Sequence, residues 1–385
     1  MSKRNILDCM TLVGAVPSRY EGKKNYVSTG AVDCDHIDYE QIKSVSYDNR
    51  PSRANLVASE GDILFAKMCG TKKTLRITPI MAEYLFSTGF CAVRANESII
   101  ISELLYHLLA SEQFLIQKDQ NCSGATQKAI TNAGLKKITI QVPDLREQHE
   151  LAAKLDRIEE LIAKRREQIF YLDNLVESRF IELFGDPVAN DHAWQTQTLE
   201  SVCTTIVDCP HSTPSYTSED TGYMCIRTSI VKRNRILWDE IEYIPEHEYH
   251  QRIQRKRPEK GDIVYTREGA ILGIAAVIDR DCNVALGQRS MLLSPNTKKC
   301  LPGFLSAAMN FDSFLRKALG GISGSASPHI NVGDIKTFDI ILPPLELQEK
   351  FVTFGEQVDK SKIAVQKNLE ELEALKKSLM QKYFM

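Results

Sequence analysis

The sequence has no long hydrophobic run and no excess of charge of either sign. No stretch approaches the roughly 18 uncharged apolar residues that would indicate a membrane-spanning helix. The opening segment, Met1–Asp8, lacks the apolar core of a signal peptide, so we expect a cytoplasmic protein with no membrane partner. The 48 lysines and arginines against 50 acidic residues give a formal net charge of −2, which argues against a wholly basic nucleic-acid binder.

Clustered cysteines are also absent. The 10 cysteines are spread singly and form no Cys-x-x-Cys pair, so we expect reduced, partly buried thiols. The nearest approach to a zinc-binding pattern is Cys203, Cys209 and His211, whose loose spacing favours a loop or structural role. The sequence pattern therefore predicts no metal site.

The motifs of common catalytic sites are missing as well. There is no Gly-x-x-x-x-Gly-Lys-[Ser/Thr] phosphate loop and no Gly-x-Gly-x-x-Gly, so ATP and dinucleotide binding have no support. Gly321–Gly324 is one residue short of a nucleophile elbow. Leu342–Leu345 lacks the polar acceptor and aromatic ring with which an amino-methyltransferase holds a flipped base. We expect a non-catalytic chain without a cofactor of its own.

The chain does contain a long internal repeat. Gly61-Asp62-Ile63 recurs as Gly261-Asp262-Ile263, a shift of 200 residues. Without any gap, the same shift superposes Gln148 on Gln348 and Phe184 on Phe384. A tandem duplication explains this register, and it predicts two related halves.

Each copy has a globular part followed by a helical part. The globular parts, 1–143 and 190–343, contain short β-like runs separated by Gly, Pro and Asn, which predicts two mixed α/β (α+β) domains. The helical parts, 144–185 and 345–385, carry long amphipathic patterns that begin just after a proline. The predicted strand runs are Ile99–Ile101, Ile138–Val142, Ile274–Ile278 and Phe338–Leu342.

The two helical patterns predict a coiled coil. Each spans about 38 residues, or roughly 57 Å at 1.5 Å per residue, and cannot bury its apolar stripe within its own globular domain. We expect the helices to pack on each other with Arg165 and Lys362 helping to set the register, and Gly185 to end the first helix. An antiparallel pair is favoured over a parallel one, because the short linker at Gly185–Asn190 starts the second domain at the far end of the first helix. The first apolar seam is Leu151, Leu155, Ile158, Ile162, Arg165, Ile169, Leu172 and Val176; the second is Phe351, Val358, Val365, Leu369, Leu372, Leu375 and Leu379.

Charge is segregated along the chain despite its neutral total. Basic runs such as Lys72-Lys73 and 252–260 lie in the globular parts, whereas acidic residues concentrate in the helices. Phosphate neutralisation requires local positive potential, not a positive total. Two globular heads on a helical spacer would suit a bipartite DNA target, and because the heads differ in sequence, the half-sites should differ too.

Several segments together resemble the specificity subunits of type I restriction-modification systems. The resemblance spans essentially the whole chain, although the first half lacks the Trp-to-Leu start of the second. It is carried by Pro143–Gln148, Leu183–Pro187, Leu342–Gln348, Leu372–Leu379, Lys260–Ile263 with Arg267–Gly269, Asp208–Pro214, Ser87–Phe90 and Trp194–Leu199.

The resemblance implies two target-recognition domains, each reading one part of an asymmetric split site in double-stranded DNA. The two helical regions would dock two methyltransferase subunits, and restriction subunits would join the full complex. S-adenosylmethionine, ATP and Mg²⁺ would belong to those partner subunits.

Polar and basic side chains near the repeated strands and loops are the candidate DNA contacts, because these residue types make most base and phosphate contacts. The rival interpretation is a coiled-coil adaptor that joins two protein partners without touching DNA. An enzyme with an unrecognised site is a third possibility. The candidate residues are Lys67, Lys72, Lys73, Arg76, Ser123, Thr126, Gln127, Lys128, Ser212, Thr213, Arg267, Arg289, Ser325, Ser327 and His329.

Overall fold

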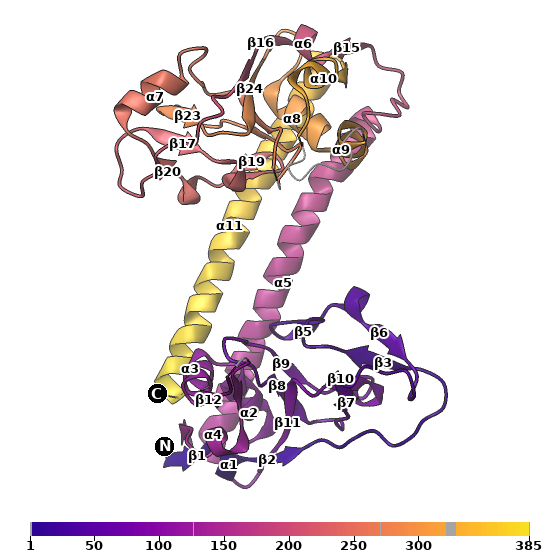
Figure 1. The fold of residues 1–385 in the computed structure, drawn as a ribbon, viewed down its shortest axis with the longest axis vertical. Helices are drawn as coiled ribbons and strands as arrows, with labels where there is room; N and C mark the ends of the chain where they lie inside the picture. Colours follow the sequence, from indigo (N-terminus) through magenta and orange to yellow (C-terminus); the bar gives the residue numbers. More distant parts are fainter. Residues whose placement is uncertain (1, 126, 270, 321–328, 385) are drawn as a thin grey trace. The chain divides into compact units, whose positions relative to one another are not determined.

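Two continuous helices of 40 residues, α5 (Leu145–Phe184) and α11 (Leu345–Phe384), follow the two globular parts of the chain (Figure 1). The computed structural model describes residues 2–125, 127–269, 271–320 and 329–384. None of the helices in these ranges is long and apolar enough to cross a membrane.

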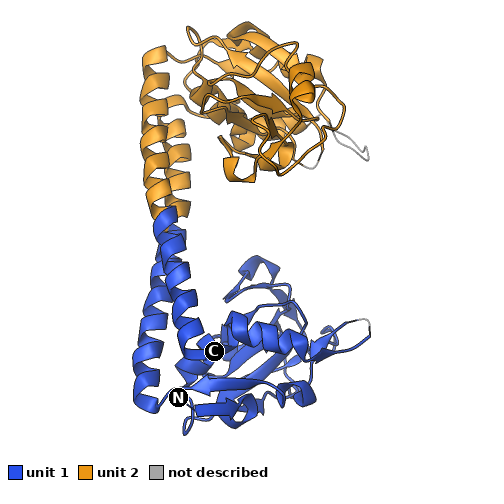
Figure 2. Ribbon diagram, turned by 90° about the vertical axis from the view of Figure 1, so that its left-hand side faces the viewer, with its two compact units in different colours: residues 1–167, 366–385 blue, residues 168–365 orange. Residues whose placement is uncertain are grey.

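The chain divides into two compact units, and the division falls within both long helices (Figure 2). Unit 1 comprises Met1–Glu167 and Gln366–Met385, and unit 2 comprises Gln168–Val365. Each unit therefore combines one globular domain with a portion of α5 and a portion of α11.

The elements of the first globular domain are short. Its helices are α1 (Ile6–Cys9), α2 (Ser102–Leu109), α3 (Glu112–Gln120) and α4 (Asn132–Leu135), with 3-10 turns at Tyr39–Gln41 and Met81–Glu83. Its strands are β1 (Ser2–Asn5), β2 (Met10–Val13), β3 (Lys24–Val27), β4 (Val32–Asp33), β5 (His36–Ile37), β6 (Lys43–Val45), β7 (Ala54–Leu56), β8 (Ile63–Ala66), β9 (Thr74–Arg76), β10 (Leu85–Ser87), β11 (Phe90–Ala95), β12 (Cys122–Ser123), β13 (Ala129–Ile130) and β14 (Thr139–Val142).

A four-stranded sheet in the order β2-β11-β8-β9 forms the centre of this domain. Its strand β8 is buried on both faces. Ile63 and Phe65 belong to the core that includes α2 and α3, whereas Leu64 and Ala66 belong to the core shared with the second sheet, β6-β3-β10-β7. Burial on both faces explains why β8 is an uninterrupted apolar run without polar alternation.

The second globular domain is built from corresponding elements. Its helices are α6 (Leu199–Val202), α7 (Glu246–Arg252), α8 (Pro302–Asn310), α9 (Asp312–Leu319) and α10 (Val332–Lys336), with 3-10 turns at Thr228–Ile230 and Trp238–Glu240. Its strands are β15 (Thr196–Thr198), β16 (Cys203–Asp208), β17 (Met224–Ile226), β18 (Val231–Lys232), β19 (Arg235–Ile236), β20 (Glu242–Tyr243), β21 (Ile263–Thr266), β22 (Ala275–Val277), β23 (Val284–Leu286), β24 (Ser290–Pro295) and β25 (Asp339–Ile341).

Strand order confirms the duplication that the 200-residue repeat predicted. The sheet β16-β24-β21-β22 repeats the order β2-β11-β8-β9, and the parallel pair β17–β23 repeats β3–β10. Copy one lacks a Trp-to-Leu opening, yet β1 pairs with β14 as β15 pairs with β25, both antiparallel. The two domains therefore share the pairing of their first strands, the order of their central sheet and one parallel strand pair, whereas the second sheet has four described strands in the first domain and three in the second.

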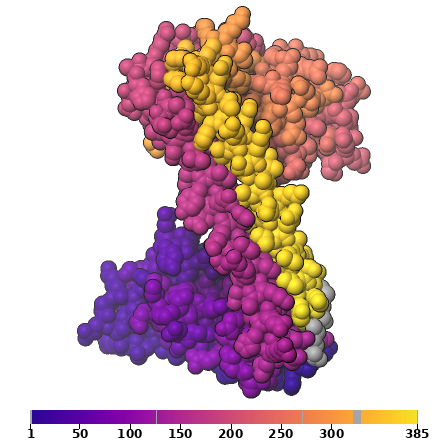
Figure 3. Space-filling model, turned by 180° about the vertical axis from the view of Figure 1, so that it is seen from behind, coloured from indigo at the N-terminus to yellow at the C-terminus, as the bar shows by residue number. Residues whose placement is uncertain are grey.

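The two long helices run antiparallel within each unit, as predicted. In unit 1, Lys376 Nζ lies 2.6 Å from Glu159 Oε1 and Arg166 Nη2 lies 2.9 Å from Glu373 Oε1. The later residue of α5 therefore contacts the earlier residue of α11, as in an antiparallel pair. In unit 2, the predicted register residue Lys362 forms an interhelical pair with Asp173 at 2.5 Å, and the ring centroids of Phe180 and Phe351 lie 5.4 Å apart, so the later residue of α5 again contacts the earlier residue of α11. Figure 3 shows the two helices side by side at the surface, with one face of the pair uncovered.

Each long helix ends in a hydrophobic core. The last turn of α5 places Phe180 and Phe184 in the core of unit 2, and Phe184 packs on Phe304 with ring centroids 4.8 Å apart. The last turn of α11 places Met380 and Phe384 in the core of unit 1. The left-handed φ of +73° at residue 185 suits glycine, which ends α5 as expected.

Two details of the sequence prediction are wrong. Leu375 is 48% exposed and does not belong to the apolar seam; its repeat partner Leu175 is 46% exposed. The run Ile99–Ile101 is a buried turn before α2, not a strand. It forms a turn because the N–H of Ile101 donates to the side chain of Gln148 (2.9 Å), so this backbone is satisfied without a neighbouring strand.

Candidate nucleic-acid interface

In unit 1, the loop after β8 and the hairpin β12–β13 form one continuous surface. The N–H of Cys69 donates to Lys128 O, and the N–H of Ile130 donates to Lys67 O, both at 2.9 Å. The turn of the hairpin is tight: Gly124 has φ +133°, and a Cβ there would lie 2.4 Å from Gln127 O. The structure thus joins two segments that lie about sixty residues apart in the sequence.

Three predicted lysines of this surface have no acidic partner. In the described part of the chain, no carboxylate forms an ion pair with Lys67, Lys72 or Lys128, and the last two are exposed. The Lys73 ammonium already has a partner within the domain, because it donates a hydrogen bond to Thr29 O at 2.8 Å. Uncompensated lysines at one loop cluster supply the local positive potential that phosphate binding requires.

Polar side chains complete this surface. Ser123 and Gln127 are exposed on the hairpin, and Gln127 Oε1 accepts a hydrogen bond from Arg53 (3.3 Å). Arg53 was not among the predicted contacts, because nothing near it in the sequence repeats or clusters. Thr126, which was predicted, lies outside the described residues.

Arg76 lies apart from the other predicted residues of unit 1. It is at the far end of β9, where its guanidinium is 3.4 Å from Asp156 of α5 and 4.6 Å from the ring centre of Tyr106. The structure therefore places Arg76 against the helix and not beside the Lys67–Lys73 loop, and its predicted DNA contact remains untested.

The corresponding surface of unit 2 is centred on Arg267, the repeat partner of Lys67. The N–H of Ile330 donates to Arg267 O (2.9 Å), and the N–H of Arg267 donates to Arg289 O (3.1 Å). The Arg267 side chain is only 8% exposed and holds Asp208 with two hydrogen bonds of 2.8 and 3.1 Å. Such a bidentate pair positions the loops, so this geometry favours a supporting role for Arg267.

Arg289 is exposed at the same surface and has a strained backbone. Its φ is +74°, a conformation that costs a non-glycine residue about 1–3 kcal/mol. A Cβ at Gly269 would lie 3.3 Å from Arg289 Nη1, so the guanidinium extends over that glycine. No ion pair holds it among the described residues. Backbone strain that presents a free cation at a loop cluster is typical of a binding residue.

The segment after β16 contributes the two remaining predicted hydroxyls of unit 2. Ser212 is exposed, and its carbonyl and hydroxyl oxygens accept from Arg252 Nη2 at 2.5 and 3.1 Å. Thr213 is exposed too, and its hydroxyl lies 2.6 Å from Gln288 Oε1. Arg252 was not a predicted site residue, although it belongs to the basic run 252–260 that the sequence analysis identified.

His329 is the last predicted residue of unit 2 that the structure describes. His329 is exposed and forms an isolated β-bridge with Glu268, as Ala129 does with Met68 in unit 1. Ser325 and Ser327 lie outside the described residues. The structure therefore brings 67, 72, 73, 123, 127 and 128 to one surface in unit 1, and 212, 213, 267, 289 and 329 to its counterpart in unit 2.

A buried histidine connects the first domain to both long helices. His107 of α2 is fully buried, with Nε2 2.9 Å from Asp156 Oδ1 and Nδ1 3.3 Å from Glu159 Oε1. Burial disfavours the imidazolium, but the hydrogen bond to Asp156 and the charge of Glu159 outweigh it and raise the pKa of His107. Burial opposes ionisation of Glu159 too, yet His107 and Lys376 lower its pKa to about 2. This charge network fixes the orientation of the domain on the helices of unit 1.

Cys203, Cys209 and His211 were the nearest approach to a zinc-binding pattern in the sequence, which favoured a loop or structural role for them. Burial raises the pKa of the Cys209 thiol, and His211 lies beside Asp208 (3.2 Å). Within the described ranges, Cys203, Cys209 and His211 do not form a group with metal-ligand spacing. The surface can bind phosphates and base edges through lysine, arginine and hydroxyl groups.

Comparisons with known proteins identify one family. The type I restriction modification DNA specificity domain matches this chain twice, at residues 18–170 and 192–374. The EcoKI specificity subunit of Escherichia coli K12 is 24% identical over 292 residues, which cover 70% of this chain and 61% of that protein's length. The chain thus spans about three fifths of that relative.

Two solved structures share the fold. The type I restriction-modification S subunit from M. genitalium has a TM-score of 0.60 at 15% identity, covering 100% of this chain and 96% of the other. A chain solved in work on complex assembly and conformational transition of the type I R-M system has a TM-score of 0.54 at 24% identity, covering 97% of both chains. At these identities the likeness concerns the fold.

Proposed function

The chain belongs to the type I restriction modification DNA specificity family, and from this premise we propose that it is the sequence-specific DNA-recognition subunit of such a complex. Each globular domain reads one half of an asymmetric, bipartite site in double-stranded DNA. The two long helices set the spacing between the half-sites.

One observation supports the proposal: at the equivalent end of both duplicated sheets, the loop after the central strand is bridged to a later segment, Met68 to Ala129 in unit 1 and Glu268 to His329 in unit 2. Cations with no ion pair among the described residues lie beside each bridge. In unit 1 these are Lys67, Lys72 and Lys128, and in unit 2 the exposed cation is Arg289. The two surfaces share backbone geometry but differ in side chains. Two half-sites of different sequence follow from this difference.

The helices provide the docking surface for two methyltransferase subunits, with restriction subunits joining the full complex. Large apolar side chains are exposed on the helical part of unit 2, namely Phe170, Tyr171, Leu175 and Ile363. Exposed apolar groups of this size on a helix face suit a protein interface. The chain itself is non-catalytic: S-adenosylmethionine, ATP and Mg²⁺ are held by the partner subunits, and it acts in the cytoplasm.

Salt dependence tests the DNA contacts. We expect the complex with its methyltransferase to bind specific duplex DNA with an affinity that falls steeply with salt. Lys72→Gln and Lys128→Gln should each reduce the slope of log affinity against log salt by about 1, because one phosphate contact is lost. The matched control is Lys350→Gln, on α11, whose ammonium pairs with Glu346 and which should leave the slope unchanged.

Domain exchange tests the two-head arrangement. Mapping of methylated adenines in a duplex library should reveal a split, asymmetric motif, and replacement of residues 190–343 by those of another specificity subunit should change one half of it. A change in both halves would contradict the proposal. Absence of DNA binding in the presence of methyltransferase would instead support the protein-adaptor alternative.

A further inference from the structure

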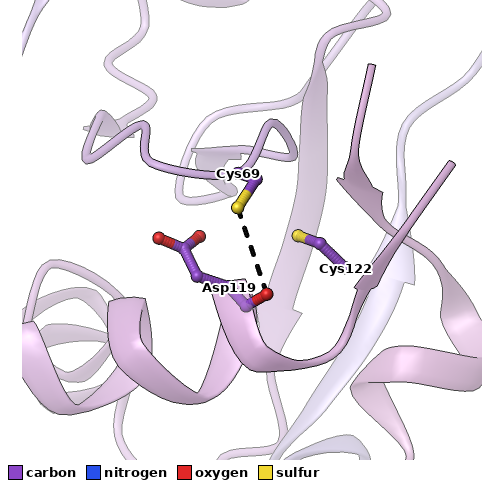
Figure 4. A group of neighbouring side chains, drawn as sticks. All are labelled: Cys69, Asp119 and Cys122. Atoms are coloured by element: carbon purple, nitrogen blue, oxygen red, sulfur yellow. Dashed lines mark hydrogen bonds between the residues drawn. The ribbon is translucent and has the colours of Figure 1, made fainter. Parts of the chain in front are cut away.

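Three potential metal ligands converge beside the proposed DNA surface of unit 1. In the ranges that the structure describes, two groups of such ligands have atoms within 4.8 Å of one another. One is His107 with Asp156 and Glu159, whose carboxylates already pair with Arg76 and Lys376. The other is Cys69, Asp119 and Cys122, drawn in Figure 4.

The three residues come from three different elements. Cys69 lies on the loop after β8, Asp119 in the last turn of α3, and Cys122 at the start of β12. Figure 4 shows the two sulfurs and the Asp119 carboxylate close together, with the Cys69 thiol also donating to Asp119 O (4.0 Å). Cys69 is exposed and the other two residues are half-buried, so a cation can enter from solvent.

The Asp119 carboxylate is oriented with one oxygen still available. Its Oδ2 accepts a hydrogen bond from the N–H of Gly70 (2.9 Å), which fixes the carboxylate against the Cys69 loop. Its Oδ1 is buried and has no hydrogen-bond partner among the described atoms. The Lys118 ammonium forms an ion pair with Oδ1 at 3.5 Å. A buried carboxylate oxygen that has an ion pair but no hydrogen bond keeps a lone pair that a metal–ligand bond would use.

Lys118 balances the charge of the group. Its side chain is fully buried, and its ammonium donates to the carbonyls of Ala66, Met68 and Thr71 (2.7 to 3.2 Å). Two thiolates and a carboxylate around a divalent cation carry a net charge of −1. The Lys118 ammonium beside Asp119 neutralises that charge and supplies the outer-shell support that metal sites require.

The duplication shows that the fold itself does not need these residues. Shifted by 200, the positions of Cys69 and Asp119 are Gly269 and Leu319, and the sequence has Ile322 where the first copy has Cys122. Both domains nevertheless share the order of their central sheet, and in both the loop after its central strand pairs with a later segment. The ligand set is therefore an addition confined to the first domain.

We propose that Cys69, Cys122 and Asp119 bind one thiophilic divalent cation, Zn²⁺ by preference, with a water molecule as the fourth ligand. Two sulfurs and one carboxylate oxygen suit tetrahedral Zn²⁺ at about 2.3 Å and 2.0–2.2 Å. Sulfur ligands at that length stand about 3.8 Å apart in a tetrahedron, so the group must contract by about 1 Å or less.

Binding releases two protons, one from each thiol, because thiolates are the ligands. Burial and the neighbouring Cys69 raise the pKa of the Cys122 thiol, so protons compete with the cation and affinity increases with pH. The cation would tie α3 and β12 to the Lys67–Lys73 loop. Its effect on DNA recognition rests on the proposed function, but cation binding does not.

The test uses the full-length chain, stripped of metal and kept under a phosphine reductant. Zn²⁺ is titrated in competition with a chromogenic chelator, and Co²⁺ is then added to the metal-free protein. We expect one Zn²⁺ per chain and a sulfur-to-cobalt charge-transfer absorption. Outer-shell changes typically weaken metal binding 10–100-fold, so Cys69→Ser and Cys122→Ser should each weaken it by about 100-fold or more, and Asp119→Asn by about 10-fold or more.

Cys282→Ser, which removes a half-buried thiol of unit 2, is the matched control and should leave binding unchanged. Far-ultraviolet circular dichroism checks that each variant folds. Wild-type binding no tighter than that of the Cys69→Ser/Cys122→Ser double variant would overturn the proposal. A Cys69–Cys122 disulfide in protein prepared without reductant, with no bound metal, would overturn it as well. DNA binding is measured in a separate experiment, so the zinc titration can be interpreted even if the proposed function fails.

Discussion

Replacement of Gln148 by methionine should loosen unit 1 far more than a typical surface substitution. The Gln148 side chain is fully buried at the start of α5. Its Oε1 accepts from the N–H of Ile101 (2.9 Å), and its Nε2 donates to Pro143 O (2.9 Å) and Ile99 O (2.8 Å). One amide thus joins the end of β14, the start of α5 and the turn before α2. Methionine preserves the approximate shape of the side chain and removes all three hydrogen bonds.

The size of the effect follows from the burial of the groups left behind. A buried donor or acceptor that loses its partner costs about 1–3 kcal/mol. Two of the three bonds of Gln148 are buried and the third is part-buried, so Gln148→Met should destabilise unit 1 by about 3–5 kcal/mol. That is a large share of the roughly 5–15 kcal/mol by which a domain is stable.

The duplication supplies a matched control. Gln348 makes the same three bonds, to the N–H of Leu301 (2.8 Å), Lys299 O (3.1 Å) and Pro343 O (2.9 Å), but only the last is buried. Gln348→Met should therefore cost less, about 1–3 kcal/mol, because water can reach two of the orphaned groups.

Native-state hydrogen exchange is the appropriate assay, because a chain of two units need not unfold in one transition. Gln148→Met should reduce protection of amides in β8 and β11, and Gln348→Met should reduce it in β21 and β24. Equal loss of protection in both units, or a cost below about 1 kcal/mol for Gln148→Met, would refute the reasoning.

Two further predictions concern charges on the long helices and on the α2 histidine packed against them. The pKa of His107 is raised in the folded protein, so the stability that the charged imidazole contributes is complete below its unfolded pKa of about 6.5 and is lost as pH rises through the folded pKa. Urea denaturation across this pH range should show the free energy of unfolding declining in wild type but not in His107→Gln. The same pH dependence in both proteins would contradict the prediction. Asp173 is 58% exposed, so Asp173→Asn should cost at most about 1 kcal/mol, whereas Glu159→Gln, half-buried beside His107 and Lys376, should cost about 3 kcal/mol by the same measurement. The reverse order would be inconsistent with burial as the cause.

Patterns that repeat along the chain could be predicted from the sequence alone. The 200-residue register, the two long amphipathic helices and the glycine stop at Gly185 all depend on local periodicity and turn chemistry. The antiparallel direction followed from the short link after Gly185, and the Lys362–Asp173 and Phe180–Phe351 contacts together confirm it in unit 2. The error at Ile99–Ile101 arose because a short apolar run fits a buried turn as well as a strand.

The candidate surface could be anticipated only in part. Lys67 and Lys128 were selected because they flank repeated segments, but Arg53 had no such signal and joins them through Gln127. The sequence drew attention to Arg267 as a basic residue, whereas its ion pair with Asp208, 59 positions away, indicates a supporting role. Cys69 and Cys122 looked like isolated thiols, because no spacing rule connects ligands that come from a loop, a helix and a strand.

By itself, therefore, the sequence determined the family, the duplication and the division of each copy into a globular domain and a helix. Those features come from regularities between near neighbours in the chain, and from the same regularities repeated 200 residues later. The tertiary structure alone decided which side chains of a domain share a surface, which cations remain unpaired, and which polar groups are buried. Those properties depend on contacts between residues distant in the sequence, and on the exclusion of water that only the packed domain produces.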